Sequence, residues 1–352
     1  MSRRKKLASR QKKTVHLCSQ SVGLKNLPSS SITIGTPELK GTTMSTPRRL
    51  LIIGCGDIGR RTTKLAIQQG WQVAGLVRSA ETLQKLRDLE ITVIEANLLD
   101  PSSLAGIETR GSSILYLAPP PGGGISDPKI RHFCASLEPG NEPDKIVYIS
   151  TSGVYGDCRG DRVTEATPPN PQTTRARRRF DAETSLRQYS ELRNVPLVIL
   201  RVTGVYGPHR FPLHRLLERH PVLREEDASY TNRIHADDLA QICLRAVEID
   251  ADGEIFNVSD GQESTMTEYF NLLADTFELP RPPQISLAEA QNRMTPLMLS
   301  YFQESRRMDN SKLLERLAVK LLYPTLQEGL KASLEQMLEE NPSFFKEVLG
   351  RS

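Results

Sequence analysis

The chain has 352 residues, of which 38% are hydrophobic and 25% are charged, a composition typical of globular proteins, and no apolar run approaches the length of a membrane span. The formal net charge is +4, but residues 1–46 alone carry nine Lys or Arg against one Glu, which leaves a net charge of −4 for the rest of the chain. We therefore expect no nucleic-acid binding through the folded body and no membrane insertion.

Residues 1–46 form a basic segment rich in Ser and Thr, without the sustained apolar period of a folded element, and we expect it to be disordered. Three interpretations stay open. The segment is hydroxyl-rich and nearly free of acids, as a targeting peptide would be. Its first basic cluster, Arg3 to Lys6, could contact an anionic partner. Alternatively, residues 1–43 are a non-native extension, because Met44 precedes the first strand and could start a complete protein.

The five cysteines are dispersed along the chain and show no paired metal-ligand spacing. An odd number of dispersed cysteines is typical of a reducing compartment. We predict a cytoplasmic protein without a metal site.

Short apolar runs alternate with helical stretches as far as about residue 205, and each run is bounded by polar, Gly or Pro residues, as buried parallel strands are. The predicted strands are Leu50–Ile53, Val73–Val77, Thr92–Glu95, Ser113–Leu117, Ile146–Thr151 and Leu197–Val202. The predicted helices between them are Ile58–Gln69, Ala80–Leu89, Lys129–Leu137 and Thr174–Leu192. This alternation predicts an α/β fold, a doubly wound parallel sheet of the Rossmann type over residues 47–205 that residues 230–260 complete.

The pattern becomes mostly helical after Val202. We predict strands at Tyr230–Ile234 and Glu254–Val258, and helices at Arg210–Arg219, Ala236–Ile249, Met266–Glu278, Leu287–Gln303 and Leu322–Asn341. Residues 206–345 are therefore expected to form a small, mostly helical substrate-binding region over the carboxyl ends of the strands.

The first candidate site is the sequence Gly54-Cys55-Gly56-Asp57-Ile58-Gly59, which follows the first predicted strand and opens the first predicted helix. In this context the first Gly makes a tight turn, the second lets the backbone approach a pyrophosphate, and the third allows close helix–strand packing. The free N–H groups of the helix N-terminus then favour the phosphates. We predict that a dinucleotide binds here, through Gly54, Gly56, Asp57, Ile58 and Gly59.

The end of the second predicted strand indicates which dinucleotide binds. NAD-binding sites usually carry Asp or Glu at this position to hold the ribose hydroxyls, whereas this chain has Arg78, whose guanidinium can pair with a 2′-phosphate. Arg60, just after the glycine loop, adds positive charge. We predict NADP(H) in preference to NAD(H), with Asn97 and Ala118 as contacts at the following strand ends. The alternative is that Arg78 is only a solvated loop residue.

Five later blocks form a recognisable set: Tyr148 to Asp157, Thr164 to Pro168, Leu200 to Pro208, Arg233 to Ala240 and Ile255 to Asp260. In this order they resemble the extended short-chain dehydrogenase/reductase family, also called NAD-dependent epimerases/dehydratases. The resemblance runs from about residue 48 to residue 332. It implies a Rossmann domain with a small C-terminal substrate domain, in agreement with the strand pattern.

The resemblance implies that Thr151 is the active-site hydroxyl that bonds the reacting oxygen of the substrate, whereas the residues alone equally indicate a turn cap. The family also carries Tyr, three residues, then Lys on the next helix. Here these positions fall on Arg175 and Arg179, and no Tyr lies between Gly156 and Tyr189. Arg175 can stabilise negative charge but cannot act as a base, and Arg179 can still hold the cofactor. The chain thus resembles an atypical bacterial subgroup without the Tyr/Lys pair.

Further groups are expected to border the crevice. Tyr155, Tyr206 and Arg210 are candidate substrate contacts, and both tyrosines can equally be structural. The arginines from Arg175 to Arg179 form either a solvated helix face or, with Arg210, a site for an anionic substrate, since helix spacing turns only some of them to one side. Asp237 is expected to cap the helix that begins there.

Two functions of different classes remain. The first is an NADP(H)-dependent oxidoreductase or epimerase-like enzyme, a monomer or homodimer, that acts on a small anionic or sugar-nucleotide-like molecule by hydride transfer assisted by Thr151 and Arg175. The second is a cofactor-binding protein without turnover, whose NADP(H) occupancy regulates a partner. The missing Tyr/Lys pair favours the second function, and the retained Thr151 favours the first.

Overall fold

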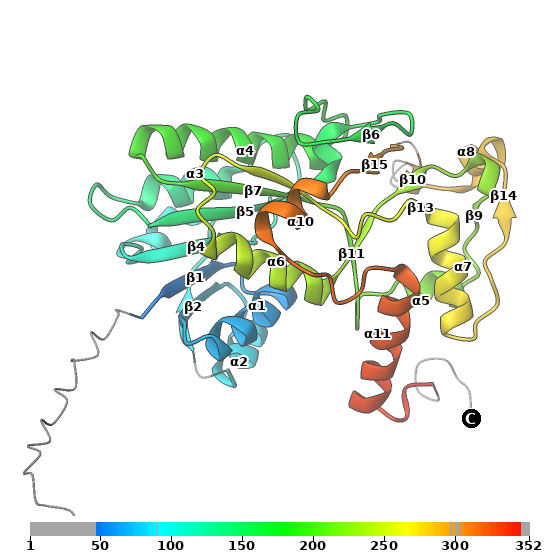
Figure 1. Cartoon of the computed structure of the whole chain (residues 1–352), viewed down its shortest axis with the longest axis horizontal. Coiled ribbons are helices and arrows are strands. Elements are labelled where there is room, and N and C mark those ends of the chain that lie inside the picture. The colour runs from blue at the N-terminus through cyan, green and yellow to red at the C-terminus, as the bar shows by residue number, and fades with distance from the viewer. Residues whose placement is uncertain (1–46, 90, 296–297, 300–301, 303, 346–352) are drawn as a thin grey trace, which may run out of the picture. The chain divides into compact units, whose positions relative to one another are not determined.

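A seven-stranded parallel sheet forms the centre of the computed structural model (Figure 1), which describes residues 47–345 apart from 90, 296–297, 300–301 and 303. The predicted basic tail lies outside the described residues. The strands are β1 (Arg49–Ile53), β2 (Gln72–Val77), β3 (Thr92–Glu95), β4 (Ser112–Tyr116), β5 (Lys145–Thr151), β7 (Leu197–Val202) and β12 (Ile255–Val258). Their order is β12-β7-β5-β4-β1-β2-β3. From β1 the chain adds β2 and β3 on one side, and it then adds β4 on the other side of β1. Such sheets bind ligands at this boundary between β1 and β4.

The apolar runs form these strands because helices cover both faces of the sheet. All six residues of β7 are buried, and the last four of β1 are buried too. A parallel sheet covered on both faces needs apolar side chains on both, which explains continuous rather than alternating runs. The predicted Rossmann-type sheet is confirmed, and its six predicted strands agree with the observed ones to within one residue at each end.

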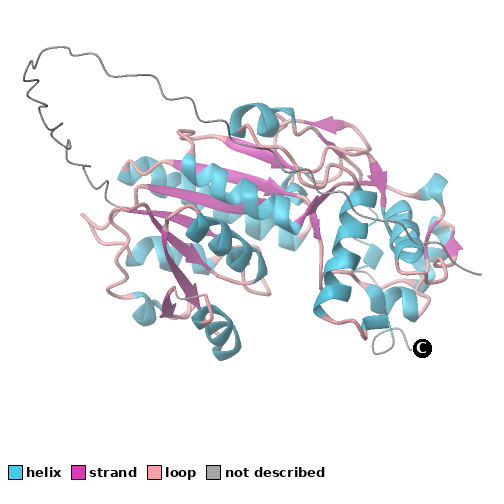
Figure 2. Cartoon of the chain, turned by 60° about the horizontal axis from the view of Figure 1, so that its bottom comes forward, coloured by secondary structure: helices cyan, strands magenta, loops and turns pink. Residues whose placement is uncertain are grey.

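Helices lie on both faces of the sheet (Figure 2). Two hydrophobic clusters fill the space between the sheet and these helices. One face carries α1 (Asp57–Gln68), α2 (Ala80–Arg87), α6 (Ala236–Glu248) and α10 (Ser311–Leu317). The other face carries α3 (Pro128–Ser136) and α4 (Thr174–Arg193). Helix α4 begins where Thr173 accepts a hydrogen bond from the N–H of Ala176, and it ends at Asn194, whose φ of 52° stops the helix in the left-handed conformation.

The C-terminal region has its own cluster, built from α5 (Leu213–Leu217), α7 (Met266–Thr276) and α11 (Leu326–Glu340). Figure 1 shows these helices beside the sheet. In the described part of the chain, four separate two-stranded sheets occur outside the main sheet: β8 (Gly204–Tyr206) with β11 (Arg233–His235), β10 (Tyr230–Thr231) with β13 (Ser264–Thr265), β9 (Val222–Leu223) with β14 (Gln284–Ile285), and β6 (Arg162–Val163) with β15 (Arg307–Met308). The 3₁₀ turns are η1 (Pro101–Leu104), η2 (Ser152–Tyr155) and η3 (Glu225–Asp227).

Four predicted elements of this region differ from the structure. The helix predicted from Arg210 begins only at Leu213, since Pro212 precedes it, and ends at Leu217. The helix predicted over Leu287–Gln303 is interrupted: α8 (Leu287–Arg293) ends at the extended Met294, and described residues are helical again at 298–299 and 302. Residue 232 separates the predicted strand at 230–234 into β10 and β11, and the last predicted helix begins four residues late.

Within the described residues, no helix combines the length and the apolar character needed to cross a membrane. The described His, Cys, Asp and Glu side chains form no group of three or more that could hold a metal ion.

Candidate functional site

Three adjoining cavities lie at the carboxyl ends of the sheet strands. The first, of about 290 Å³, is bounded by the glycine turn and the ends of β2, β3 and β4. The second, of about 610 Å³, lies between the glycine turn, the ends of β5 and β7, and α4. The third, of about 280 Å³, lies between the end of β5 and the C-terminal region. Gly54, Gly56 and Pro119 line the first two cavities, and Thr151, Arg175 and Thr203 line the last two.

Of the three glycines of the turn, only Gly56 has open space beside its Cα. Gly54 has a φ of +82°, and a Cβ there would lie 2.7 Å from the backbone of Ala118. A Cβ on Gly59 would lie 3.0 Å from the Sγ of Cys55, so this glycine allows α1 to pack on the sheet. A Cβ on Gly56 would meet nothing closer than 4.0 Å. The open space beside Gly56, at the N-terminus of α1, fits the phosphates of a dinucleotide.

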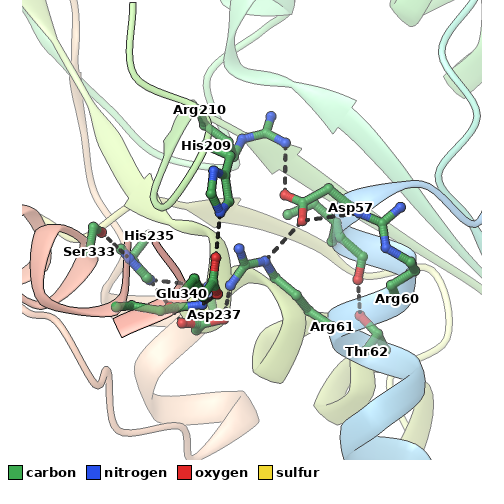
Figure 3. A network of polar contacts seen from close by, with 12 residues as sticks. Asp57, Arg60, Arg61, Thr62, His209, Arg210, His235, Asp237, Ser333 and Glu340 are labelled. Carbon is green, nitrogen blue, oxygen red and sulfur yellow. Dashed lines mark hydrogen bonds and ion pairs between the residues drawn. The ribbon is translucent and has the colours of Figure 1, made fainter. Parts of the chain in front are cut away.

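A network of ion pairs joins the start of α1 to the C-terminal region (Figure 3). Asp57 accepts from Arg61 Nε at 3.1 Å and from Arg210 Nη1 at 3.0 Å. Arg61 Nη1 also pairs with Asp237 Oδ1 at 2.5 Å. Arg60 lies 3.8 Å from the Asp57 carboxylate and lines neither cavity beside the glycine turn. These guanidiniums offset the negative charge that Asp57 places near the phosphate position.

Positive side chains border the first cavity, which Asn97 and Ala118 also line. Arg78 lies at the exposed end of β2, and Lys129 lies across the same cavity. Lys129 Nζ donates to the carbonyl oxygen of Pro119 at 2.7 Å. Burial lowers the pKa of the Lys129 amine, and the charges of Arg78 and of an arginine of α4 act in the same direction. An anionic group on a ligand in this cavity would relieve that repulsion.

Three arginines of α4 face the second cavity: Arg175, Arg178 and Arg179. Their spacing places them on one helix face, whereas Arg177 turns away and donates to the carbonyl oxygen of Pro171 at 3.3 Å. The prediction that only some of these arginines share one side is therefore confirmed.

The three arginines have different surroundings. Arg179 Nη1 donates to the carbonyl oxygen of Ile149 at 2.8 Å and to Tyr148 Oη at 3.3 Å, so its position is fixed by β5. Arg178 Nη1 donates to the carbonyl oxygen of Gly124 at 3.0 Å, which ties the loop that contains Gly122, Gly123 and Gly124 to α4. Arg175 lies where the second and third cavities meet.

Thr151 is the last residue of β5 and lines both the second and the third cavity. Its Oγ1 accepts from the N–H of Gly153 at 3.2 Å, so the hydroxyl caps the following 3₁₀ turn. An oxygen that accepts this bond keeps its own proton to donate to a ligand. The turn-cap role is thus observed, and it leaves the predicted substrate contact open.

The two candidate substrate tyrosines lie in the interior, each at most 2% exposed. Tyr155 Oη donates to Asn257 Oδ1 at 2.7 Å, and its ring lies 4.8 Å from the guanidinium carbon of Arg201. Tyr206 packs edge-on against His235 with the ring centroids 5.2 Å apart. Neither tyrosine lines any of the three cavities. This geometry supports the structural interpretation and not a direct substrate contact.

The cap of α6 is not the predicted one. His235 Nδ1 accepts from the N–H of Asp237 at 3.2 Å, so His235 is the N-cap, and the prediction that Asp237 caps this helix is wrong. Burial lowers the pKa of His235 to about 4, which keeps the ring neutral and able to accept this bond.

Sequence reasoning gave no role to several residues that line the cavities. Lys129 was only the start of a predicted helix, and Arg233, Glu304 and Arg306 of the third cavity come from segments without a clear period. Their charge was the available signal, but the topology that brings residues 233 and 304–306 to one cavity is not readable from local sequence.

The model of the NAD dependent epimerase/dehydratase family matches residues 132–259. Human dTDP-D-glucose 4,6-dehydratase is 28% identical over 133 residues, which cover 36% of this chain and 38% of that protein. An uncharacterised UDP-glucose epimerase of Bacillus subtilis is 31% identical over 149 residues, or 38% of this chain and 46% of that protein. The chain therefore spans less than half the length of these two curated relatives.

Solved structures resemble a larger part of the chain. A functionally unknown conserved protein from Silicibacter pomeroyi has a TM-score of 0.70 and 27% identity, covering 82% of this chain and 99% of that one. The UDP-glucuronic acid 4-epimerase of Bacillus cereus, solved in complex with NAD, has a TM-score of 0.65 and 20% identity, covering 83% and 99%. The second likeness shows a shared fold. Together with the sheet order and the glycine turn, these similarities show the fold of the chain and its resemblance, over residues 132–259, to the NAD dependent epimerase/dehydratase family.

Proposed function

We propose that this protein is an oxidoreductase or epimerase-type enzyme that uses NADP(H) in preference to NAD(H) on a small, anionic substrate. The observation that carries the proposal is the continuous run of cavities with its basic residues. Arg78 and Lys129 border the first cavity, the open space at Gly56 lies between the first and the second, and Thr151 and Arg175 lie where the second meets the third.

The residues present fit a dinucleotide phosphate. The N-terminus of α1 would hold the pyrophosphate beside Gly56, and Arg78 with Lys129 would hold a 2′-phosphate in the first cavity. Arg179, fixed against Ile149, would contact the ribose side. When bound, the nicotinamide supplies or accepts a hydride.

The chain's own residues then act on the substrate oxygen. The Thr151 hydroxyl donates a hydrogen bond to it: the bond from the N–H of Gly153 uses one lone pair of Oγ1 and leaves the hydroxyl proton available. Arg175 lies close enough to line the same two cavities and stabilises negative charge that develops on that oxygen. Arg175 remains protonated, so it holds charge but takes no proton.

We propose the corresponding division of labour along the chain. Residues 47–205 with residues 230–260 bind the cofactor, and residues 206–345 hold the substrate. Arg210, paired with Asp57, links the two parts at the second cavity. We place the protein in the cytoplasm, as a monomer or homodimer.

A second candidate is a regulatory protein that binds NADP(H) without turnover. Arginines at the two positions where the family carries Tyr and Lys favour it. Oxidation of NADPH in the presence of an acid that carries a carbonyl group, followed as a loss of NADPH absorbance, would exclude this candidate. Tight NADPH binding without NADPH oxidation by any such acid would favour it.

The preference for NADP(H) is tested by calorimetric titration of the full chain with NADPH and, separately, NADH. We expect NADPH to bind more tightly. In Arg78→Gln the NADPH affinity should fall about tenfold or more, since a charge-assisted hydrogen bond is worth about 1.5–3 kcal/mol, while NADH binding should not change.

Arg87→Gln is the matched control, because Arg87 lies at the exposed end of α2 and does not line the first cavity. Equal NADPH and NADH affinities in the wild type, unchanged in Arg78→Gln, would contradict the preference for NADP(H). Absence of binding by either dinucleotide would contradict the proposed function as a whole.

A further inference from the structure

We propose that the third cavity is an oxyanion-binding subsite for a compact acid, a carboxylate or a phosphate monoester that carries a neighbouring hydroxyl group, and that no nucleotide is needed for binding there. The inference names the substrate class of the enzyme and rests on the proposed function. It follows from the polar atoms that the cavity walls leave without partners, from the charge of those walls, and from the size of the cavity.

Unpartnered buried polar atoms gather around this cavity. Arg233 Nε, Arg306 Nε, Glu304 Oε1 and Thr231 Oγ1 have no hydrogen-bond partner in the described structure, and all four residues line the cavity. Buried polar groups are normally satisfied, so a cluster of exceptions calls for a ligand or bound water. Three of these atoms are on charged side chains, which favours a ligand with its own charge.

Arg233 is held at the cavity mainly by packing; burial lowers the pKa of its guanidinium, and the nearby Asp260 carboxyl acts in the opposite direction. Its guanidinium carbon lies 4.2 Å from the ring centroid of Tyr269, and its Nη2 lies 3.2 Å from the Sδ of Met266. Gly204 provides the space for it, since a Cβ at that position would lie 2.4 Å from Arg233 Nη1. Among the described side chains, none forms a salt bridge with Arg233. A buried guanidinium that forms no direct salt bridge can still take a carboxylate or a phosphate as its hydrogen-bonded partner.

Arg306 and Glu304 supply the complementary part of the wall. Each is about nine-tenths buried, with exposures of 9% and 8%. Arg306 Nη1 donates to the carbonyl oxygen of Gly156 at 2.5 Å, and both Nη atoms contact Glu304 Oε2. Glu304 Oε1 is left as an acceptor, which suits a hydroxyl donor on the ligand. With Arg175, the wall carries three cations and one anion, so it favours an oxyanion.

The position of the cavity joins it to the reaction site. Thr151 and Arg175 line both this cavity and the second one, so an acid held by Arg233 and Arg306 would lie next to the active-site hydroxyl. The volume of about 280 Å³ is small. Pockets for drug-sized ligands span about 300–1,000 Å³, so the third cavity suits a molecule of a few carbons and not a whole nucleoside diphosphate sugar.

The test is calorimetric titration of the full chain with four probes: D-glycerate, glycerol 3-phosphate, glycerol and UDP-glucose. We expect one or both acids to bind, glycerol not to bind, and UDP-glucose to bind no better than the acids. The ratio of the two acid affinities identifies which oxyanion the subsite prefers. Arg233→Gln should weaken acid binding about tenfold or more, while leaving NADPH affinity unchanged.

Two further variants keep the test decisive if Arg233→Gln does not fold. Glu304→Gln keeps the shape and an acceptor oxygen but removes one negative charge, so it should strengthen binding of glycerol 3-phosphate. Arg281→Gln is the control for net charge, because Arg281 is exposed and pairs with Asp275 away from the cavity. This variant should change the affinity for neither acid.

Three outcomes would overturn the subsite: binding of NADPH but of neither acid, binding of UDP-glucose much tighter than either acid, or acid binding that is unaffected by Arg233→Gln and Glu304→Gln. Acid binding without NADPH binding would leave the subsite standing and contradict the proposed function instead. The two failures are therefore distinguishable.

Discussion

Gly54 and Gly56 lie two residues apart, yet an added methyl group would meet different surroundings at each. At Gly54 it would enter the backbone of Ala118 in a residue whose φ is +82°, which L-residues rarely adopt. At Gly56 it would project into space that no protein atom fills within 4.0 Å. The fold therefore requires glycine at position 54, whereas at position 56 only the proposed dinucleotide would require it.

This contrast gives a paired prediction. Gly54→Ala should lower the free energy of unfolding by about 1–3 kcal/mol, because it adds backbone strain and a steric clash. Gly56→Ala should leave that free energy within about 0.5 kcal/mol of the wild type and weaken dinucleotide binding about tenfold or more. Urea unfolding and calorimetric titration of both variants check this. Unchanged NADPH affinity in a folded Gly56→Ala variant would mean that the dinucleotide does not pass beside this residue.

At the scale of elements, helix α4 serves the cavity and the core with different faces. Its arginines at 175, 178 and 179 line the second cavity, while Glu183, two turns after Arg175, is fully buried against the sheet. Glu183 receives two hydrogen bonds from Arg201 of β7, at 2.8 Å and 3.2 Å. This ion pair fixes the rotation of α4 on the sheet, and the rotation decides which arginines reach the cavity.

Glu183→Gln therefore should destabilise the protein strongly. The variant leaves the Arg201 charge buried at 2% exposure without its counter-charge, and breaking such a pair costs about 3–5 kcal/mol. Asp275→Asn is the matched control, because it removes an exposed pair with Arg281 and should cost less than about 1 kcal/mol. Chemical denaturation measures both. A loss for Glu183→Gln as small as that of the control would mean that the pair does not hold α4.

The sheet could be predicted because each of its strands is a short, continuous apolar run, and such a run indicates a strand that is buried on both faces. The glycine turn could be predicted because strand, motif and helix follow one another in the chain. The strand β8 is three residues long, so no period can be read in it, and it forms only because it pairs with β11. The helix α10 also went unpredicted, since its apolar contacts are with β12 and α6 rather than with sequence neighbours.

In the candidate site, too, the residues with a local sequence signal could be predicted, and those placed by contacts between distant segments could not. Arg78 and the arginine face of α4 could be placed from the strand end and the helix spacing. The tyrosines at 155 and 206 could not, because their burial depends on Arg201, Asn257 and His235, which come from other elements. The third cavity could not be predicted from the sequence either, since residues 233 and 304–306 come together only in the folded chain.

At the scale of the whole molecule, two buried groups, Asp260 and His235, should act on the pH dependence of stability in opposite directions. Burial raises the pKa of Asp260 to about 7 from a usual value of 3.8. Its unfolded form ionises first, so the stability it contributes is present below pH 3.8 and is lost as the pH rises through 7. Burial lowers the pKa of His235 to about 4 from 6.5. The stability from His235 is present above pH 6.5 and is lost as the pH falls through 4.

Between pH 4 and 6.5 the effects of Asp260 and His235 on stability oppose each other, and of these two groups only Asp260 contributes between pH 6.5 and 7. Asp260→Asn keeps the acceptor for the N–H of Gln262 but removes the titration. Its stability should therefore rise with pH from 4 to 6.5 more steeply than that of the wild type, on the order of 1.4 kcal/mol for each unit of pKa shift removed. His235→Asn keeps an N-cap acceptor for α6 and should show the opposite, a stability that falls as the pH rises. Urea midpoints measured from pH 4 to 8 for the three proteins decide the matter. Parallel curves for the wild type and Asp260→Asn would show that the Asp260 carboxyl titrates alike in the folded and unfolded chains.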